Sequence, residues 1–296
     1  MKVSAALRET AIWRAARAIR HEWPHYAGRV FPGPDARALH GLCEGMQRRG
    51  GSTTIGYFDD GSIPAEAIVA AYAEMMEQLG AVTPGAVMSG GVALAIKAPP
   101  LGFDAAHFRK LATLAQGKGM SLIFDAHGPA DADATLAAVE DLLPAFPATG
   151  CALPARWARS FSDVARLRDS SARIRVVKGE WPDTDGHGPA NMDADYLKLV
   201  AALAGRKAPV GIATHKPALA EQALALLNAA GTPCELEQLR GLPRRRTVAV
   251  ARRLGVPVRL YIPFGPGWTP YAIGAALGRP HIISWMLRDV LNRPDA

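Results

Sequence analysis

Long hydrophobic runs are missing from this chain of 296 residues. No stretch approaches the roughly 18 uninterrupted apolar residues that a membrane-spanning helix needs. The first ten residues carry several charges and lack the apolar segment of a secretory signal. These two absences predict a cytoplasmic protein without an integral membrane segment.

Cysteine is scarce, and the spacing of the cysteines matches no metal-binding pattern. Cys43, Cys151 and Cys234 are an odd number, lie far apart and form no pair at metal-ligand spacing. This excludes a disulfide framework, and inert buried thiols are a better interpretation than a nucleophile. The eight histidines form no His-x-His pattern, and His127, His187 and His215 are scattered along the chain, so we expect no metal site.

Aromatic residues make up 7 % of the chain, and they do not alternate with its basic residues, although the net charge is +7. A stacking platform for nucleic acid needs that combination, so we expect no nucleic-acid partner. The one dense basic run, Arg244 to Arg246 with Arg252 and Arg253, is interpreted as the solvated face of a helix. A Gly-x-Ser-x-Gly elbow is also missing, which argues against a Ser-His-Asp hydrolase.

From about residue 52 onward the chain alternates between strand-like and helix-like segments. The strand-like runs are 52–58, 91–97, 120–125, 150–154, 173–178, 210–214, 234–239 and 257–263. The helix-like stretches are 64–79, 104–116, 131–143, 161–168, 193–204, 217–229 and 243–254, with a last helical region at 271–291. Residues such as Ser62 and Asp193 are suitable caps at the helix starts.

Eight strands, each followed by a helix, predict an α/β fold, a (β/α)₈ TIM-like barrel. A doubly wound open sheet is the competitor, but it usually carries a Gly-x-Gly-x-x-Gly turn, which this sequence lacks. The first 49 residues differ from the rest and read as a helical N-terminal lead. The predicted organisation is therefore a lead at 1–49 and a barrel with a C-terminal helix at 50–296.

Polar and charged residues gather where several of these strands end. Lys97 follows a buried run, and Asp125 ends the next strand, two residues before His127. Thr214 and His215 end a later strand. In parallel α/β folds the functional groups collect at the carboxyl ends of the strands. The pattern predicts a site there for an anionic or strongly polarised ligand.

Each of these residues also has a structural interpretation. Lys97 could be a structural lysine whose head reaches solvent, Asp125 could cap the next helix, and His215 could be a satisfied histidine. Arg175 lies within its strand, and because side chains alternate it faces the same way as Val177. If Arg175 points into the barrel, its guanidinium must be paired with an anion or a polar cofactor.

Several of these segments resemble the proline dehydrogenase family. Residues 175–179 (Arg-Val-Val-Lys-Gly) are similar to its Arg-Leu-Val-Lys-Gly strand, and 213–215 to the start of its Ala-Thr-His-Asn segment. Residues 235–241 resemble its Glu-Phe-Gln-x-Leu-x-Gly strand, and 259–265 its Arg-Val-Tyr-Val-Pro-Tyr-Gly strand. Shorter matches fit the first three strands. The resemblance runs in the family's order from about residue 52 to 285.

The resemblance implies a distorted barrel that holds FAD noncovalently at its C-terminal rim. It implies oxidation of a C–N bond by hydride transfer to the flavin, with electrons passed on to a quinone. Carried over by motif, Lys97, Asp125, Arg175 and Tyr261 would be catalytic, with Arg175 near flavin N5. The implied cofactor-binding residues are Arg175, Lys178, Gly179, Thr214, His215, Lys216, Glu237 and Leu239.

The last helix departs from the family pattern. There a tyrosine is followed by two adjacent arginines that clamp the substrate carboxylate, and then by a supporting glutamate. Here Tyr271 matches, but Gly274 and Ala275 stand at the arginine positions and Gly278 at the glutamate position. Charge-assisted hydrogen bonds contribute roughly 1.5–3 kcal/mol each. Loss of the clamp therefore predicts carboxylate binding weaker by on the order of 10²–10⁴-fold.

Other rim positions change as well. The family's Gln-Ala-Tyr after strand four is Pro154-Ala155-Arg156 here, and its Ala-Tyr after Lys-Gly is Glu180-Trp181. Lys216 replaces the asparagine after Ala-Thr-His, and Glu237 replaces the glutamine of strand seven. We therefore predict a divergent flavoenzyme that dehydrogenates an amine or imino compound other than free proline.

Two substrate classes stay open for this flavoenzyme. Arg156 or Arg240 could replace the lost clamp, whereas Glu180 and Glu237 could favour a cationic amine without a carboxylate. The candidate substrate residues are Arg156, Glu180, Trp181, Arg240 and Tyr271. The alternatives are a catalytically silent barrel that binds flavin or a partner, and a true L-proline dehydrogenase with a rebuilt carboxylate site.

Overall fold

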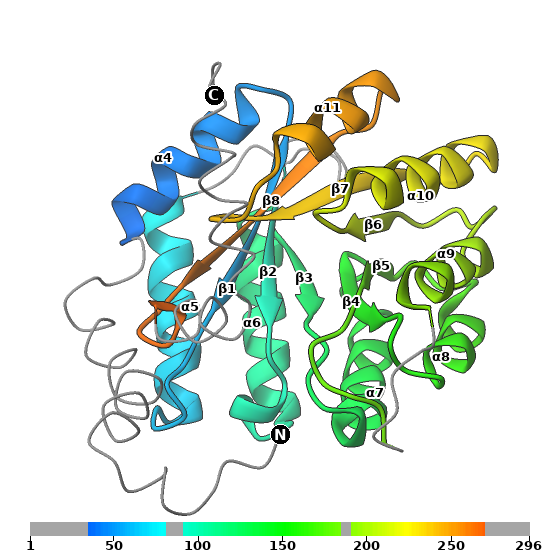
Figure 1. The fold of residues 1–296 in the computed structure, drawn as a ribbon. Helices are drawn as coiled ribbons and strands as arrows, with labels where there is room; N and C mark the ends of the chain where they lie inside the picture. The colour runs from blue at the N-terminus through cyan, green and yellow to red at the C-terminus, as the bar shows by residue number, and fades with distance from the viewer. Residues whose placement is uncertain (1–34, 81–90, 185–190, 270–296) are drawn as a thin grey trace, which may run out of the picture.

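The computed structural model describes residues 35–80, 91–184 and 191–269, and in them eight parallel strands close into a barrel (Figure 1). The strands are β1 (Ser52–Tyr57), β2 (Val92–Ile96), β3 (Ser121–Phe124), β4 (Thr149–Pro154), β5 (Arg173–Val177), β6 (Val210–Ala213), β7 (Cys234–Leu239) and β8 (Val258–Phe264). β1 pairs with β2 on one side and with β8 on the other, which closes the ring. The predicted barrel is confirmed over the doubly wound alternative.

Helices ring the barrel on the outside (Figure 1). α4 (Ala36–Gln47) precedes β1, and one α-helix follows each of the first seven strands. These are α5 (Ala65–Leu79), α6 (Ala105–Gly117), α7 (Ala132–Leu142), α8 (Ser160–Leu167), α9 (Met192–Ala202), α10 (Pro217–Ala229) and α11 (Arg245–Arg253). Two short 3₁₀ helices, η1 (Pro99–Leu101) and η2 (Pro129–Asp131), follow β2 and β3.

Helix starts were predicted less well than the helices themselves. Asp104 caps α6, because its carboxylate accepts a hydrogen bond of 2.6 Å from the Ala106 amide. At α9 the predicted cap Asp193 is wrong: Asn191 accepts from the Ala194 amide at 3.1 Å, and Asp193 lies in the first turn. The predicted cap Ser62 is also wrong, since α5 begins after Pro64 without a side-chain cap.

Of the predicted N-terminal lead, only α4 and the residues next to it are described. Residues 1–34 and the predicted last helix at 271–291 lie outside the described residues. The division at residue 49 therefore stays a prediction.

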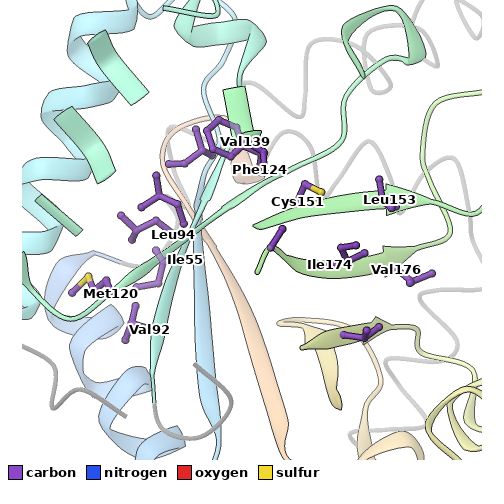
Figure 2. Close-up of a cluster of buried hydrophobic side chains, with 14 of the residues drawn as sticks. Ile55, Val92, Leu94, Met120, Phe124, Val139, Cys151, Leu153, Ile174 and Val176 are labelled. Carbon is purple, nitrogen blue, oxygen red and sulfur yellow. The ribbon is translucent and has the colours of Figure 1, made fainter. Parts of the chain in front are cut away.

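The outward faces of the strands carry the hydrophobic core between barrel and helices (Figure 2). Ile55, Leu94, Phe124, Ile174 and Val176 are all fully buried there. They pack against apolar helix residues such as Val139 and Leu111. The three cysteines are free and buried, as the sequence predicted. Each is an ordinary packing residue whose pKa burial raises.

The inside of the barrel is unusually polar. Barrel interiors are commonly filled by branched apolar side chains. Here several strands contribute small residues, and a Cβ at Gly211 would lie 2.6 Å from Nη2 of Arg173. A Cβ at Gly56 would overlap the Tyr261 hydroxyl. Small residues on some strands thus make room for long polar side chains from β5, β7 and β8.

Candidate active site

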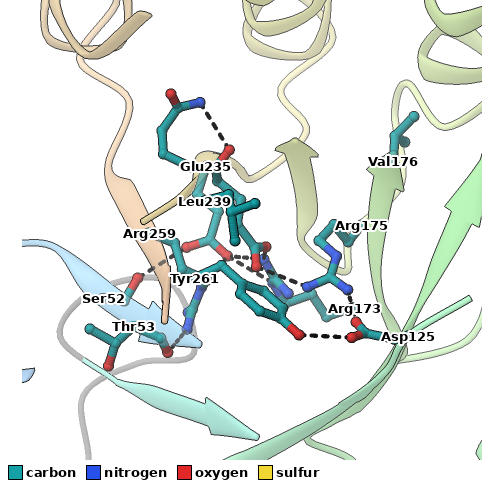
Figure 3. A network of polar contacts seen from close by, with 12 residues as sticks. Ser52, Thr53, Asp125, Arg173, Arg175, Val176, Glu235, Leu239, Arg259 and Tyr261 are labelled. Atoms are coloured by element: carbon teal, nitrogen blue, oxygen red, sulfur yellow. Dashed lines mark hydrogen bonds and ion pairs between the residues drawn. The ribbon is translucent and has the colours of Figure 1, made fainter. Parts of the chain in front are cut away.

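A network of buried ion pairs starts near the amino ends of the strands (Figure 3). Glu235 on β7 accepts hydrogen bonds from Nε of Arg259 at 2.8 Å and from Nε of Arg173 at 2.7 Å. The Ser52 hydroxyl donates to the other oxygen of Glu235 at 3.2 Å. Arg259 also donates to the Thr53 carbonyl at 2.6 Å. Every charge in this lower layer is therefore paired.

The upper layer of the network centres on Arg175, which points into the barrel. One guanidinium nitrogen, Nη1, donates to Glu237 at 2.9 Å, and Nη2 donates to Asp125. Glu237 also accepts from Arg173 at 2.7 Å, which joins the two layers. The condition that an inward Arg175 needs an anionic partner is met by two carboxylates of the chain itself.

Asp125 is the point where three other side chains meet at the mouth of the barrel. Besides Arg175, the Tyr261 hydroxyl donates to it at 2.8 Å, and the Lys97 ammonium approaches it at 3.4 Å. Lys97 also donates to the Tyr57 carbonyl at 3.0 Å and lies 3.9 Å above the ring of Phe58. The side chains of Lys97 and Asp125 are 15 % and 14 % exposed, so this end of the network reaches solvent.

Burial and pairing set the protonation states of these groups. Burial raises the pKa of Asp125, but Arg175 and Lys97 outweigh that effect and hold it below its ordinary value. Burial likewise opposes ionisation of Glu237, yet Arg175 and Arg173 lower its pKa to about 2. Burial lowers the pKa of Lys97, with Asp125 acting in the opposite direction. Burial and then Asp125 raise the pKa of Tyr261, so its hydroxyl stays protonated.

The residues after β6 are held by the chain itself. His215 has both ring nitrogens engaged, Nδ1 with the Pro243 carbonyl at 2.8 Å and Nε2 with the Leu239 amide at 3.2 Å. Lys216 is half exposed and forms an ion pair with Asp193 at 2.7 Å. Thr214 is buried, and its hydroxyl accepts from the Lys216 amide at 3.2 Å. These three predicted cofactor residues therefore serve local structure in this conformation.

The loops after β4 and β5 pack together beside the mouth. Gly179 has φ +92°, and a Cβ there would lie 2.8 Å from Cβ of Pro154, so a side chain would not fit. Nη1 of Arg156 donates to the Glu180 carbonyl at 2.8 Å, while its Nε is buried without a partner among the described residues. Lys178 next to this corner is exposed.

Trp181 continues this loop toward β3. It is 47 % exposed and stacks on His127, with ring centroids 6.1 Å apart. Its carbonyl accepts from the Trp157 indole at 3.1 Å.

Two further predicted residues lie where β7 ends, Leu239 as its last residue and Arg240 directly after it. Leu239 is partly buried against the inner apolar cluster that contains Tyr261. Arg240 is partly exposed, and its amide donates to the Tyr261 carbonyl at 2.8 Å. Tyr271 and the positions of the lost arginine clamp lie outside the described residues.

The structure thus brings Lys97, Asp125, Arg175, Tyr261 and Glu237 together, and it adds residues that were not predicted. Arg173, Glu235 and Arg259 complete the network, and Phe58 covers Lys97. The signal for two of them was in the sequence: Arg173 and Glu235 stand two residues before Arg175 and Glu237, and therefore share their strand face.

Within the described ranges, no cluster of three or more histidine, cysteine, aspartate or glutamate side chains is able to hold a metal ion. Among the helices in those ranges, none is long and apolar enough to cross a lipid bilayer.

The protein is therefore a (β/α)₈ barrel with a cluster of ion pairs at the carboxyl ends of its parallel strands, where such barrels carry their functional groups. A family model described as proline dehydrogenase matches residues 52–269, which is most of the chain. The protein therefore belongs to the proline dehydrogenase family, and the resemblance seen in the motifs is confirmed.

Individual relatives are distant. Proline dehydrogenase 1 of Bacillus subtilis (strain 168) is 23 % identical over 215 residues, covering 68 % of this chain and 70 % of that protein. The proline dehydrogenase of Deinococcus radiodurans is 28 % identical over 192 residues, covering 62 % of each chain.

Solved structures of larger proteins contain the same fold. Proline utilization A (PutA) from Bdellovibrio bacteriovorus superposes with a TM-score of 0.71 at 17 % identity, covering 84 % of this chain and 32 % of that one. PutA from Corynebacterium freiburgense gives a TM-score of 0.65 at 18 % identity, covering 96 % and 34 %. This chain therefore spans about a third of the PutA chains that it matches.

Proposed function

We propose that the protein is an FAD-dependent oxidoreductase that dehydrogenates a C–N bond of an amine or imino compound, with a substrate site that differs from that of proline dehydrogenases. Family membership supports an oxidoreductase acting on such a bond. The observation that carries the proposal is the cluster at the mouth, where Arg175, Lys97 and Tyr261 all converge on Asp125.

The residues at the mouth fit a flavin. Nε of Arg175 and Nε of Arg156 are both buried and have no hydrogen-bond partner among the described residues. An unpaired buried donor costs free energy, and a bound group rich in acceptor atoms would satisfy it. Arg175 would hold the ring system, with Lys178 and Thr214 toward the rest of the cofactor. When bound, FAD supplies the acceptor for a hydride from the carbon next to the substrate nitrogen.

The chain's own residues would prepare the substrate. An ammonium cannot release a hydride readily from its neighbouring carbon until it loses a proton. Lys97 is suited to accept that proton, because burial lowers its pKa and increases its neutral fraction. Asp125 stays ionised and holds Lys97 in place, while the protonated Tyr261 hydroxyl fixes Asp125 from the other side.

The two substrate classes that stay open are carboxylate-bearing imino acids and amines without a carboxylate, and they differ in the contact that the substrate needs besides the flavin. A carboxylate-bearing imino acid needs a cation in place of the missing clamp, and Arg156 and Arg240 are the candidates beside the mouth. An amine without a carboxylate needs no such cation, and Glu180 favours it. The expectation that Glu237 contacts the substrate is wrong, because that carboxylate is buried and both of its oxygens are bound to Arg173 and Arg175. Trp181 and Tyr271 complete the proposed substrate set. The quinone acceptor and the cytoplasmic location stay predictions.

A catalytically silent barrel is the second candidate, and one observation favours it. His215 and Lys216, which the family resemblance assigns to the cofactor, are already engaged within the chain. The third candidate, a true L-proline dehydrogenase, needs a rebuilt carboxylate site. Both are outcomes of the same experiment.

The test is cofactor uptake followed by anaerobic reduction. The purified protein, with FAD added, should show flavin absorbance, and bound FAD should raise the unfolding temperature. Arg175→Met should weaken uptake, whereas Arg253→Met, which removes an exposed ion pair with Glu221, should leave it unchanged. A colourless protein whose unfolding temperature does not respond to FAD overturns the proposal.

The substrate class follows from which compound bleaches the bound flavin. Reduction by pyrrolidine and other simple amines, but not by L-proline, supports the altered site. Reduction by L-proline at low concentration establishes the third candidate instead. A loaded protein that no amine reduces establishes the silent barrel.

A further inference from the structure

Glu237 is shared between two arginines in the middle of the barrel. One carboxylate oxygen, Oε2, accepts from Arg173 at 2.7 Å, and the other, Oε1, accepts from Arg175 at 2.9 Å. The three side chains are at most 5 % exposed, so water does not compete for these bonds. Each oxygen therefore serves one arginine.

Arg173 holds this carboxylate from the amino-end side of the barrel. Its own guanidinium is fixed by Glu235, which Arg259 and Ser52 fix in turn. Close packing leaves little freedom, because Nη2 of Arg173 passes directly over Gly211 on β6. Glu237 is thus anchored by a layer that does not itself reach the mouth.

Arg175 receives its orientation from two sides. Glu237 on β7 binds Nη1, and Asp125 at the end of β3 binds Nη2. Two acceptors on different strands fix both the plane of the guanidinium and the direction of its unpaired Nε–H. A glutamine at 237 would offer one acceptor oxygen and turn an NH₂ donor toward the other arginine. Only a carboxylate satisfies both.

We propose that Glu237, anchored by Arg173, is a positioning residue that sets the orientation and charge balance of Arg175 at the mouth of the barrel. For its effect on a bound flavin this inference rests on the proposed function. For its effect on Arg175 it does not. Glu237 acts through Arg175 and touches no reacting atom.

The decisive measurement is the rotation of the Arg175 guanidinium, followed by NMR on the flavin-free protein. With both Nη groups held, their proton signals should be separate, as identified by their loss in Arg175→Lys. In Glu237→Gln and in the double variant Arg173→Met/Glu237→Gln these signals should merge. Glu221→Gln, on the exposed face of α10, should leave them separate.

Stability distinguishes positioning from a purely structural role. Glu237→Gln leaves two buried arginines each short of a carboxylate, and the folding equilibrium constant should fall by about 100-fold or more. The double variant removes the Arg173–Glu237 pair together and should recover most of that loss. Arg175 should nevertheless remain free to rotate. If Glu237→Gln does not fold, Glu237→Asp, one methylene shorter, is measured in the same way.

The flavin provides an independent reading. Removing a carboxylate from Arg175 leaves its charge less compensated, so the midpoint potential of bound FAD should become more positive in Glu237→Gln than in Glu221→Gln. Separate Nη signals in the double variant, or an unchanged potential in Glu237→Gln, would overturn the inference. Failure to bind FAD would overturn the proposed function instead, and the NMR result would still decide the role of Glu237.

Discussion

Gly56 determines where Tyr261 is able to lie. It faces the tyrosine ring across the β1–β8 pair, and a Cβ at this position would overlap the hydroxyl that donates to Asp125. The site thus depends on a missing side chain on β1 as well as on the polar residues of β3 and β8.

Gly56→Ala should therefore displace Tyr261 and lower the free energy of unfolding by about 1–3 kcal/mol, the usual cost of forcing atoms into a packed interior. Urea unfolding measures the change. Gly41→Ala is the matched control, because nothing lies within 4 Å of a Cβ there and the position is exposed on α4. That variant should be as stable as the parent or more stable by up to about 1 kcal/mol. Equal stability of both variants would contradict the role assigned to Gly56.

At the scale of elements, helix starts depend on single side chains. The carboxylate of Asp104 satisfies amide groups at the start of α6 that have no partner within the helix. Asp104→Ala should lower the free energy of unfolding by about 1 kcal/mol, whereas Asp104→Asn keeps an acceptor oxygen and should cost less. Thermal unfolding of the two variants side by side gives the answer. Equal losses in the two variants would show that the charge of Asp104, rather than its acceptor oxygen, stabilises the helix.

The order and bounds of strands and helices could be predicted because they depend on local periodicity. The cap of α9 could not: Asp193 and Asn191 are both good capping residues, and only the position of the first turn selects Asn191. The alternation of side chains along β5 left two possible directions for Arg175, and pointing into the barrel was one of them. Its partners could not be predicted, since Asp125 and Glu237 are 50 and 62 residues away in sequence.

Partners that are distant in sequence also explain why the predicted cofactor contacts at the barrel rim differ from the structure. His215 was expected to face a cofactor, but its partners are the Leu239 amide at the end of β7 and the Pro243 carbonyl in the following loop. No pattern near residue 215 predicts them. Arg173 was overlooked because it begins its strand. A face of charged residues inside a barrel runs against the usual apolar filling, and nothing near residue 173 in the sequence indicates its buried partners.

For the whole molecule, the ionic interior predicts how stability depends on pH. In the folded state the pKa of Glu237 is about 2, below its ordinary value of 4.5, because Arg175, Arg173 and Arg259 outweigh the opposing effect of burial. A carboxylate whose pKa is lowered in the folded state stabilises the fold at pH values above its ordinary pKa of 4.5. That stabilisation is lost as the pH falls from 4.5 toward about 2. The pKa of Asp125 is also lowered in the folded state, and its titration adds to the same loss of stability at low pH.

Urea unfolding between pH 6 and pH 2 should therefore show stability falling below about pH 4.5. The slope should be steeper than in Arg173→Met/Glu237→Gln by up to about 1.4 kcal/mol per pH unit. The double variant keeps Asp125 and serves as the reference for its contribution. Parallel curves for the two proteins would show that Glu237 titrates alike in the folded and unfolded chains.

The carboxylate of Glu237, shared by two arginines, also restricts which substitutions related sequences are able to accept. Losing Glu237 alone removes one negative charge from the buried network, and losing Arg173 alone removes one positive charge, so either loss unbalances the ion pairs that remain. Descendants and cousins of the protein should therefore keep both residues or exchange both together, so positions 173 and 237 are expected to covary although they belong to strands that are not neighbours.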